Sequence, residues 1–309
     1  MKNIHTLYNY DNLKENFFFD SEIEQRNTLA NFLKEDIGTG DITSNLLIPK
    51  ESVSSGSIIC KNEDKIRSTK TTIASGLAEA KIIFEICGCK ATQFVEDGSV
   101  ISKGTIVMSV DGASRSILKA ERTALNLIMR MSGISTRTRE FIEKLDDLSQ
   151  VVHIASTRKT APGLRYFDKK AVVLGGGISH RTRLDQLILI KDNHIAVVGS
   201  VKRAIELAKS SYESNRKIEC EVVDLDGLVE AIRAGADIVM LDNFTPDQVK
   251  HSLEKIKEYG LRDKAIIEIS GGITYDNIYD FAVSHPDVIS IGSLTHSVKS
   301  IDYSLEISN

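Results

Sequence analysis

Cysteines are few in this sequence, and their spacing gives them no clear structural role. The four are Cys60, Cys87, Cys89 and Cys220, and no two of them form a C-x-x-C pair. We therefore expect neither a disulfide framework nor a zinc site. Reduced thiols are typical of a cytoplasmic protein, and the cytoplasm is the localisation that we expect.

Long apolar runs and a strong charge excess are also missing. No window approaches the roughly 20 apolar residues that span a bilayer, and the run at 17–19 is far shorter than the core of a signal peptide. The net charge at pH 7 is only −4. We therefore expect neither a nucleic acid nor a membrane as partner, and an anionic substrate would need a local cluster of cations.

The 309 residues show two different patterns of apolar residues along the chain. Between 53 and 118, short alternating segments separated by glycine turns predict strands, with one covering helix that carries Ala78, Ile82, Ile83 and Ile86 on its apolar stripe. A long amphipathic segment follows at 120–145. Beyond it, six short apolar runs alternate with helical patterns, at 151–155, 187–190, 218–223, 237–241, 265–269 and 288–291.

These six runs predict parallel β/α units. A complete barrel of this type has eight strands. We therefore predict an incomplete α/β barrel, closed by the first domain or by a second subunit.

Cationic side chains gather at the predicted strand ends. Arg158 and Lys159 follow the first run and Lys191 follows the second, while His180 and Arg181 come shortly after the triple glycine 175–177. This glycine run lacks the G-x-G-x-x-G spacing of a dinucleotide fold, and we interpret it as a flexible loop. Because the carboxyl ends of barrel strands form the active site, these groups predict a doubly charged anionic ligand.

Carboxylates occupy the next two strands. Glu219 and Glu221 lie two residues apart and share one face of their strand, and Asp242 ends the neighbouring strand. Such groups can bind sugar hydroxyls, hold Mg²⁺ or stabilise positive charge on a reacting carbon. A core salt bridge with nearby lysines is the structural alternative, and it is strongest for Glu219.

Glycine turns follow the last two strands, at Ser270-Gly271-Gly272 and Gly292-Ser293. Barrels commonly bind a phosphate there, on backbone N–H groups and a helix N-terminus. Each pair could equally be a simple turn. Occurring together at the last two strands, they favour a phosphate site.

Several long motifs resemble the quinolinate phosphoribosyltransferase family. The similarity is colinear over roughly residues 28 to 305, and its most specific parts are the runs at 35–43, 121–126, 157–165, 175–181, 189–194 and 241–244. This resemblance implies an N-terminal open α/β sandwich at 28–119 and an incomplete α/β barrel at 120–294. It also implies that 295–309 packs back on the N-terminal domain. Residues 1–27, rich in Asn, Asp and Lys in their first part, are predicted to form an arm or a short helix.

The resemblance implies a reaction as well. Quinolinate and phosphoribosyl pyrophosphate would give nicotinate mononucleotide, pyrophosphate and CO2 in de novo NAD biosynthesis, with Mg²⁺. The enzyme would be a homodimer or a multiple of one, with Arg122 reaching into the partner's site.

Residue roles follow from the same resemblance. Those binding quinolinate would be Arg122, Arg158, His180, Arg181 and Lys191. The catalytic groups, which would also bind phosphoribosyl pyrophosphate, would be Lys159, Glu221 and Asp242, the last two with Mg²⁺. The 5′-phosphate would lie on Ser270, Gly271, Gly272, Gly292 and Ser293.

The sequence departs from the family's motif at one place, and three alternative functions stay open. Thr182-Arg183-Leu184 stands where the family typically has an apolar residue and a glycine, and we expect Arg183 to be a surface residue. The alternatives are a molybdenum-transport-associated paralogue, a phosphoribosyltransferase for another nitrogenous acid, and a non-catalytic sensor of phosphoribosyl pyrophosphate or nucleotide. Lys191-Asp192-Asn193-His194 argues against the first, and intact Glu221 and Asp242 argue against the sensor.

Overall fold

A computed structural model describes residues 21–62, 71–211 and 216–308. Backbone contacts group these residues into two compact units. The antiparallel unit comprises the described residues of 21–140 together with 166–176 and 297–308. The barrel unit comprises 141–165 and the described residues of 177–296. No helix of the described residues combines the length and apolar character needed to cross a membrane.

The antiparallel unit begins with helix α2 (Glu22–Ile37), whose N-cap Ser21 accepts a hydrogen bond from the Glu24 N–H. Residues 22–27, for which the sequence predicts an arm or a short helix, form the first turns of this helix. The rest of the predicted arm lies outside the described residues. Helix α3 (Ile42–Leu47) follows, capped by Asp41.

A four-stranded antiparallel sheet forms the centre of this unit, in the order β12-β1-β5-β3. Its strands are β12 (Tyr303–Ser308), β1 (Val53–Cys60), β5 (Ile106–Ala113) and β3 (Lys90–Gln93). The last strand of the chain pairs with β1, so the C-terminal segment joins this unit. Strands β2 (Thr72–Ile73) and β4 (Val100–Ile101) form a separate small pair.

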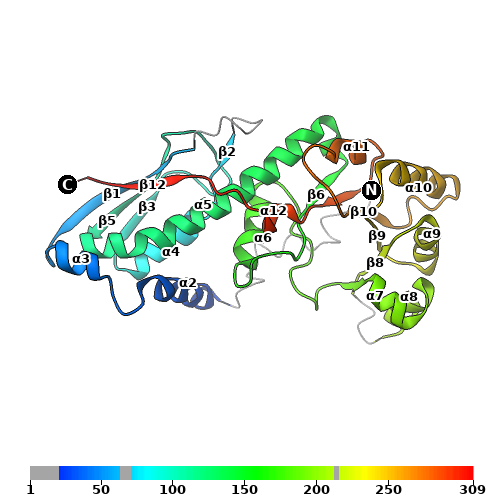
Figure 1. Cartoon of the computed structure of the whole chain (residues 1–309), viewed down its shortest axis with the longest axis horizontal. Coiled ribbons are helices and arrows are strands. Elements are labelled where there is room, and N and C mark those ends of the chain that lie inside the picture. The colour runs from blue at the N-terminus through cyan, green and yellow to red at the C-terminus, as the bar shows by residue number, and fades with distance from the viewer. Residues whose placement is uncertain (1–20, 63–70, 212–215, 309) are drawn as a thin grey trace. The chain divides into compact units, whose positions relative to one another are not determined.

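Helices α4 (Leu77–Ile86) and α5 (Ser114–Leu145) run along one side of this sheet (Figure 1). The predicted stripe on α4 is only partly right. Ile83 is buried, but the other buried apolar residues are Leu77, Ala80 and Phe84, and the remaining predicted positions are half-exposed. The buried face of α4 is rotated about the helix axis relative to the predicted stripe, because Phe84, and not Ile86, faces the interior.

Helix α5 begins at Ser114, and its residues up to 140 belong to the antiparallel unit, whereas the predicted barrel domain begins at 120. The domain limits at 28–119 and 120–294 therefore stay a prediction.

The barrel unit is built on a parallel sheet with the strand order β6-β11-β10-β9-β8-β7. Its strands are β6 (His153–Ala155), β7 (Ile188–Ile190), β8 (Ile218–Val222), β9 (Ile238–Asp242), β10 (Ile266–Ser270) and β11 (Val288–Ser290). All six predicted strands are confirmed. A parallel bridge between Ala155 and Ile178 extends the sheet beyond β6.

The other helices connect these strands. They are α6 (Arg165–Leu174), most of which belongs to the antiparallel unit, α7 (Asp192–Val198), α8 (Val201–Ser210), α9 (Leu225–Ala234), α10 (Pro246–Glu258), α11 (Ile278–Ala282) and α12 (Ser293–His296). A 3-10 helix, η2 (Asp146–Gln150), precedes β6.

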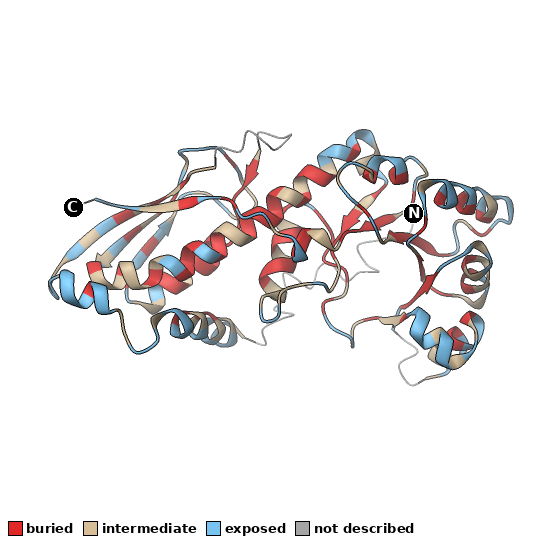
Figure 2. Cartoon of the chain, viewed as in Figure 1, coloured by how far each residue is buried: buried red, intermediate tan, exposed pale blue. Residues whose placement is uncertain are grey.

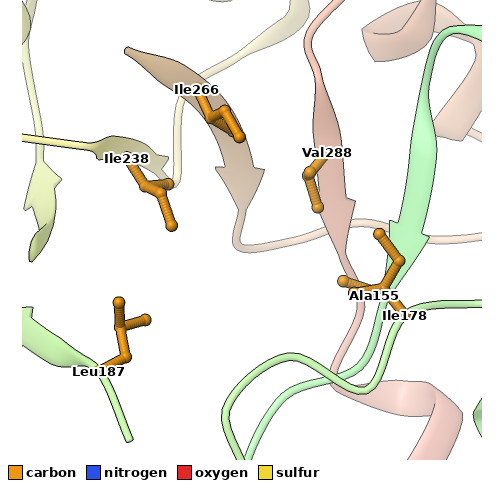
Figure 3. Packing of buried hydrophobic residues seen from close by; sticks show 6 residues of the cluster. All are labelled: Ala155, Ile178, Leu187, Ile238, Ile266 and Val288. Atoms are coloured by element: carbon orange, nitrogen blue, oxygen red, sulfur yellow. The ribbon is translucent and has the colours of Figure 1, made fainter. Parts of the chain in front are cut away.

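The interior of the barrel unit holds one apolar layer. Its buried members are Ala155, Ile178, Leu187, Ile238, Ile266 and Val288, and Figure 3 shows these side chains around a common space. Figure 2 shows the strands buried and the outer faces of helices α8 to α10 exposed. Because successive side chains alternate between faces, the residue two places after Ile266 also faces this interior. That residue is Glu268.

Candidate active site

The cations predicted from the sequence come from several strand ends of the barrel unit. Arg158 and Lys159 follow β6, Lys191 directly follows β7, and Arg181 lies just beyond the Ile178 bridge. The Thr295 hydroxyl donates a hydrogen bond to the Lys159 carbonyl at 2.9 Å, which fixes the chain after β6 beside the segment after β11.

Lys191, Glu221 and Asp242 form one part of this site. Lys191 Nζ lies 2.6 Å from Glu221 Oε2, and Asp242 ends the strand next to Glu221. Burial raises the pKa of Asp242 and Glu221 raises it further, while Lys191 and Lys159 act in the opposite direction. The four charged side chains therefore interact with one another at one end of the sheet.

Arg158 and Arg181 form a second part. Burial lowers the pKa of Arg181, Glu219 opposes this shift, and the nearby charge of Arg158 adds to it. The Arg158 Nε is buried and has no hydrogen-bond partner among the described residues. Arg181 Nη1 donates to the Leu187 carbonyl at 3.2 Å, just before β7. Two like charges and an unpaired donor together favour an anionic ligand.

His180 is buried below these arginines. Its Nε2 lies 3.3 Å from Glu219 Oε2 and 3.4 Å from Glu268 Oε2, and both glutamates are fully buried. Burial alone would lower the pKa of His180, but Glu268 and Glu219 together raise it to about 9. Burial raises the pKa of Glu219, and His180 counteracts this shift. The partner of Glu219 is thus a histidine, and the lysine salt bridge that was the structural alternative is found at Glu221, with Lys191.

Glu268 was missed from the sequence. It lies inside the predicted strand 265–269, where only the apolar residues were considered. A detectable signal was present, because a glutamate in the middle of a buried apolar strand requires a partner.

The glycine turns lie at the same strand ends. Gly271 has φ +92°, and a Cβ there would come within 2.2 Å of Asn243 Oδ1, so the turn after β10 accepts only glycine. A Cβ added at Gly292 would lie 3.2 Å from the Lys159 side chain, which places this turn beside a cation. Ser293 starts α12 directly, but residues 273–277 separate Gly272 from α11. The expected helix therefore follows only one of the two turns.

Two further arginines lie elsewhere. Arg183 is exposed and pairs with the exposed Asp185 at 3.1 Å, which confirms that it is a surface residue. Arg122 is exposed on α5 and belongs to the antiparallel unit. The structure thus groups Lys159, Lys191, Glu221 and Asp242 in one cluster and Arg158 with Arg181 in another, and Arg122 stays a prediction.

Fold and site together define a class of protein. A parallel β/α unit with cations, carboxylates and glycine turns at the carboxyl ends of its strands is typical of barrel enzymes that act on anionic substrates.

Comparisons with known proteins identify the family within this class. The quinolinate phosphoribosyl transferase N-terminal domain matches residues 41–132 and the C-terminal domain matches residues 134–306. The chain therefore belongs to the quinolinate phosphoribosyltransferase family. It is an enzyme of the pentosyltransferase class.

Curated relatives are similar in sequence to this chain over most of its length. A probable nicotinate-nucleotide pyrophosphorylase [carboxylating] of Methanocaldococcus jannaschii is 45% identical over 281 residues, covering 90% of this chain and 95% of the relative. The Bacillus subtilis protein of the same name is 38% identical, covering 93% and 94%. The human nicotinate-nucleotide pyrophosphorylase [carboxylating] is 36% identical, covering 73% and 75%.

Solved structures confirm the fold. NadC from Streptococcus pyogenes is 34% identical, with a TM-score of 0.84 and coverage of 93% of this chain and 98% of that one. The nicotinate-nucleotide pyrophosphorylase from Francisella tularensis is also 34% identical, with a TM-score of 0.82 and coverage of 92% and 96%. The predicted incomplete α/β barrel with a preceding N-terminal α/β domain is confirmed.

Proposed function

We propose that this chain condenses quinolinate with phosphoribosyl pyrophosphate in NAD biosynthesis. The products are nicotinate mononucleotide, pyrophosphate and CO2. The observation that carries this proposal is the division of charge at the strand ends. Arg158 and Arg181 repel one another and suit an acid with two carboxylates, while Lys159 lies beside a glycine turn and suits a phosphate.

In this proposal each substrate has its own set of residues. Those for quinolinate in the barrel unit are Arg158, His180, Arg181 and Lys191. Those for phosphoribosyl pyrophosphate are Lys159, Glu221, Asp242, Ser270, Gly271, Gly272, Gly292 and Ser293. Holding both substrates in line lowers the entropic part of the barrier to their reaction.

Mg²⁺ is the metal that fits the donor set. Glu221 and Asp242 are carboxylates on neighbouring strands, and the charge of Glu221 raises the pKa of Asp242. A hard divalent cation relieves such repulsion and prefers oxygen ligands. When bound with the substrate, Mg²⁺ would neutralise charge on the pyrophosphate.

The chain's own residues supply the rest of the chemistry. As the bond to pyrophosphate breaks, positive charge develops on the ribose carbon, and Glu221 and Asp242 stabilise it electrostatically. The pyridine nitrogen then forms the new bond to that carbon. The ring becomes cationic and stabilises the electron pair that the departing carboxylate leaves on the ring carbon, and a proton from solvent then bonds to that carbon to give nicotinate mononucleotide. Decarboxylation therefore requires Arg158 and Arg181 to hold the acid in place, and it requires no general base.

A homodimer completes this proposal, with Arg122 of each chain contributing to the partner's acid site. The exposure of Arg122 on α5 supports a role at a surface that another chain covers. We also propose that the enzyme works in the cytoplasm, since all four cysteines are free thiols.

Product formation tests the proposal directly. The purified chain with quinolinate, phosphoribosyl pyrophosphate and Mg²⁺ should form nicotinate mononucleotide, measured by chromatography, and release one CO2 per product. With nicotinate as the only acid we expect little or no product. Product from nicotinate without CO2 would indicate a transferase for another acid, and binding without any product would indicate a sensor.

Two arginine variants make the test specific. Arg158→Ala should lower kcat/KM by roughly 100-fold or more, since it removes charged hydrogen bonds to the acid. Arg183→Ala is the matched control, because Arg183 pairs with Asp185 at the surface, and it should keep wild-type turnover. Equal activity of the two variants would remove Arg158 from the site.

A further inference from the structure

Two fully buried glutamates face one histidine inside the barrel unit. Glu219 comes from β8, Glu268 from β10, and His180 from the segment after the Ile178 bridge. The two carboxylates meet at His180 Nε2, at 3.3 and 3.4 Å. Buried charge is costly unless it is compensated, so this arrangement of three side chains requires a reason.

The backbone at His180 is held in an unusual conformation. Its φ is +54°, in the left-handed region, which costs a non-glycine residue on the order of 1 kcal/mol. The Ser179 hydroxyl donates to the His180 carbonyl at 3.1 Å, and the Ser156 hydroxyl donates to the Ser179 carbonyl at 2.9 Å. The surroundings therefore fix this residue on both its backbone and its ring.

The next residue, Arg181, depends on this conformation. Its N–H donates to His180 Nδ1 at 2.7 Å, and its guanidinium reaches the Leu187 carbonyl. The ring therefore links the buried glutamates on one side to the backbone of Arg181 on the other. A shift of the ring would move the arginine.

We propose that Glu268, together with Glu219, is a positioning residue that acts through His180 to hold Arg181 for the acid substrate. This inference rests on the proposed function, because it deepens the account of the acid site. Glu268 sets the affinity for the dicarboxylate and leaves the affinity for phosphoribosyl pyrophosphate unchanged.

A metal ion is the main alternative for this cluster, since its three ligand atoms lie within 4.8 Å of one another. The histidine argues against it. The carboxylates raise the pKa of His180 to about 9, which favours a ring with two protons. The Arg181 N–H at Nδ1 favours a neutral ring with its proton on Nε2. Both forms carry a proton on Nε2, which a metal would have to displace before it could bind that atom.

A double-mutant cycle tests the proposal. Glu268→Gln keeps the size of the side chain and removes its charge. His180→Asn keeps a residue that tolerates positive φ but is too short to reach both carboxylates. We expect Glu268→Gln to raise the Kd for quinolinate, measured by calorimetry, by about tenfold, the size of one charged hydrogen bond. The Kd for phosphoribosyl pyrophosphate should stay within about twofold.

In the His180→Asn background, the same Glu268→Gln change should have almost no further effect, because its route to Arg181 is gone. Glu79→Gln is the matched control, since Glu79 is equally buried but pairs with Lys170 in the antiparallel unit. It should leave both Kd values unchanged. If Glu268→Gln does not fold, Glu268→Asp keeps the charge, shortens the reach and replaces it in the cycle.

The outcomes separate this proposal from the proposed function. Failure of the wild-type chain to bind quinolinate would overturn the proposed function and this inference with it. Wild-type binding with additive effects of the two changes would overturn the positioning role alone. So would uptake of one Zn²⁺ or Mn²⁺ ion by the wild-type chain that Glu268→Gln abolishes, because the cluster would then be a metal site.

Discussion

At the residue scale, His180 illustrates how burial and charge compete at one side chain. Burial favours the neutral ring, while two adjacent carboxylates favour the charged one. The carboxylates outweigh burial because both are fully buried, where water screens their charge poorly, while the Arg181 N–H at Nδ1 favours the neutral ring. A residue that the sequence placed among the acid ligands is therefore tied to the interior of the barrel unit.

The pH dependence of stability should reflect the raised pKa of His180. The pKa of His180 is about 9 in the folded chain and 6.5 ordinarily, so the folded state holds the second proton more tightly. The resulting stabilisation is fully present below pH 6.5 and is lost as the pH rises through 9. The difference in urea midpoint between the wild type and His180→Asn should therefore shrink over this range. A difference that does not change with pH would mean a neutral ring, protonated on Nε2.

Sequence reasoning at this scale found the charged residues that follow the strands and missed the one within a strand. Arg158, Lys191 and Asp242 were found because polar residues after a parallel strand have a known location. Glu268 was hidden among isoleucines. The partner of Glu219 could not be predicted either, because the path of the chain from the triple glycine to His180 depends on a bridge between Ile178 and Ala155 that no local pattern encodes.

At the scale of elements, the barrel unit depends on the apolar layer below the charged groups. Each of its strands except β8 contributes to this layer or adjoins it, with Ile238 and Ile266 in register on β9 and β10. The layer fixes the spacing of the strands, and on β10 Glu268 lies two positions beyond Ile266, on the same face. Packing in the layer therefore contributes to the geometry of the site.

Ile266→Ala should destabilise the chain by about 2–4 kcal/mol, because it removes buried methyl groups and leaves a cavity among well-packed neighbours. Ile266 is fully buried, whereas Ile23 on α2 is 71% exposed, so Ile23→Ala makes the same chemical change without a cavity. Urea unfolding followed by circular dichroism gives both values. Similar losses of stability in the two variants would contradict a large contribution of the apolar layer to the free energy of unfolding.

The strands were easier to predict than the helices for a physical reason. Parallel strands buried on both faces appear as continuous apolar runs, and all six were identified within a few residues. A helix covering an antiparallel sheet has only one apolar stripe, and on α4 several choices of stripe fit the same residues. The structure selects the face that includes Phe84. The start of α5 was missed because its first turn follows β5 directly, with no intervening loop.

At the scale of the whole molecule, the remaining question is whether one chain makes a complete site. Within the part of the chain that the structure describes, the parallel sheet has six strands and an added bridge, fewer than the eight of a closed barrel. Arg122, which the family resemblance assigns to the acid site, is exposed on the antiparallel unit. A dimer that exchanges Arg122 between its chains would account for the exposure of this arginine.

Mixing two inactive variants tests this exchange. Arg122→Ala and Arg158→Ala should each be nearly inactive, since each loses one group that holds the acid. If Arg122 acts in the partner's site, a mixed dimer has one site that lacks both arginines and one that is intact. Random exchange of subunits should then restore about a quarter of the wild-type activity. Sedimentation should show particles of twice the mass of one chain. If both groups act within one chain, every site in the mixture stays defective and activity does not return, whatever the oligomeric state.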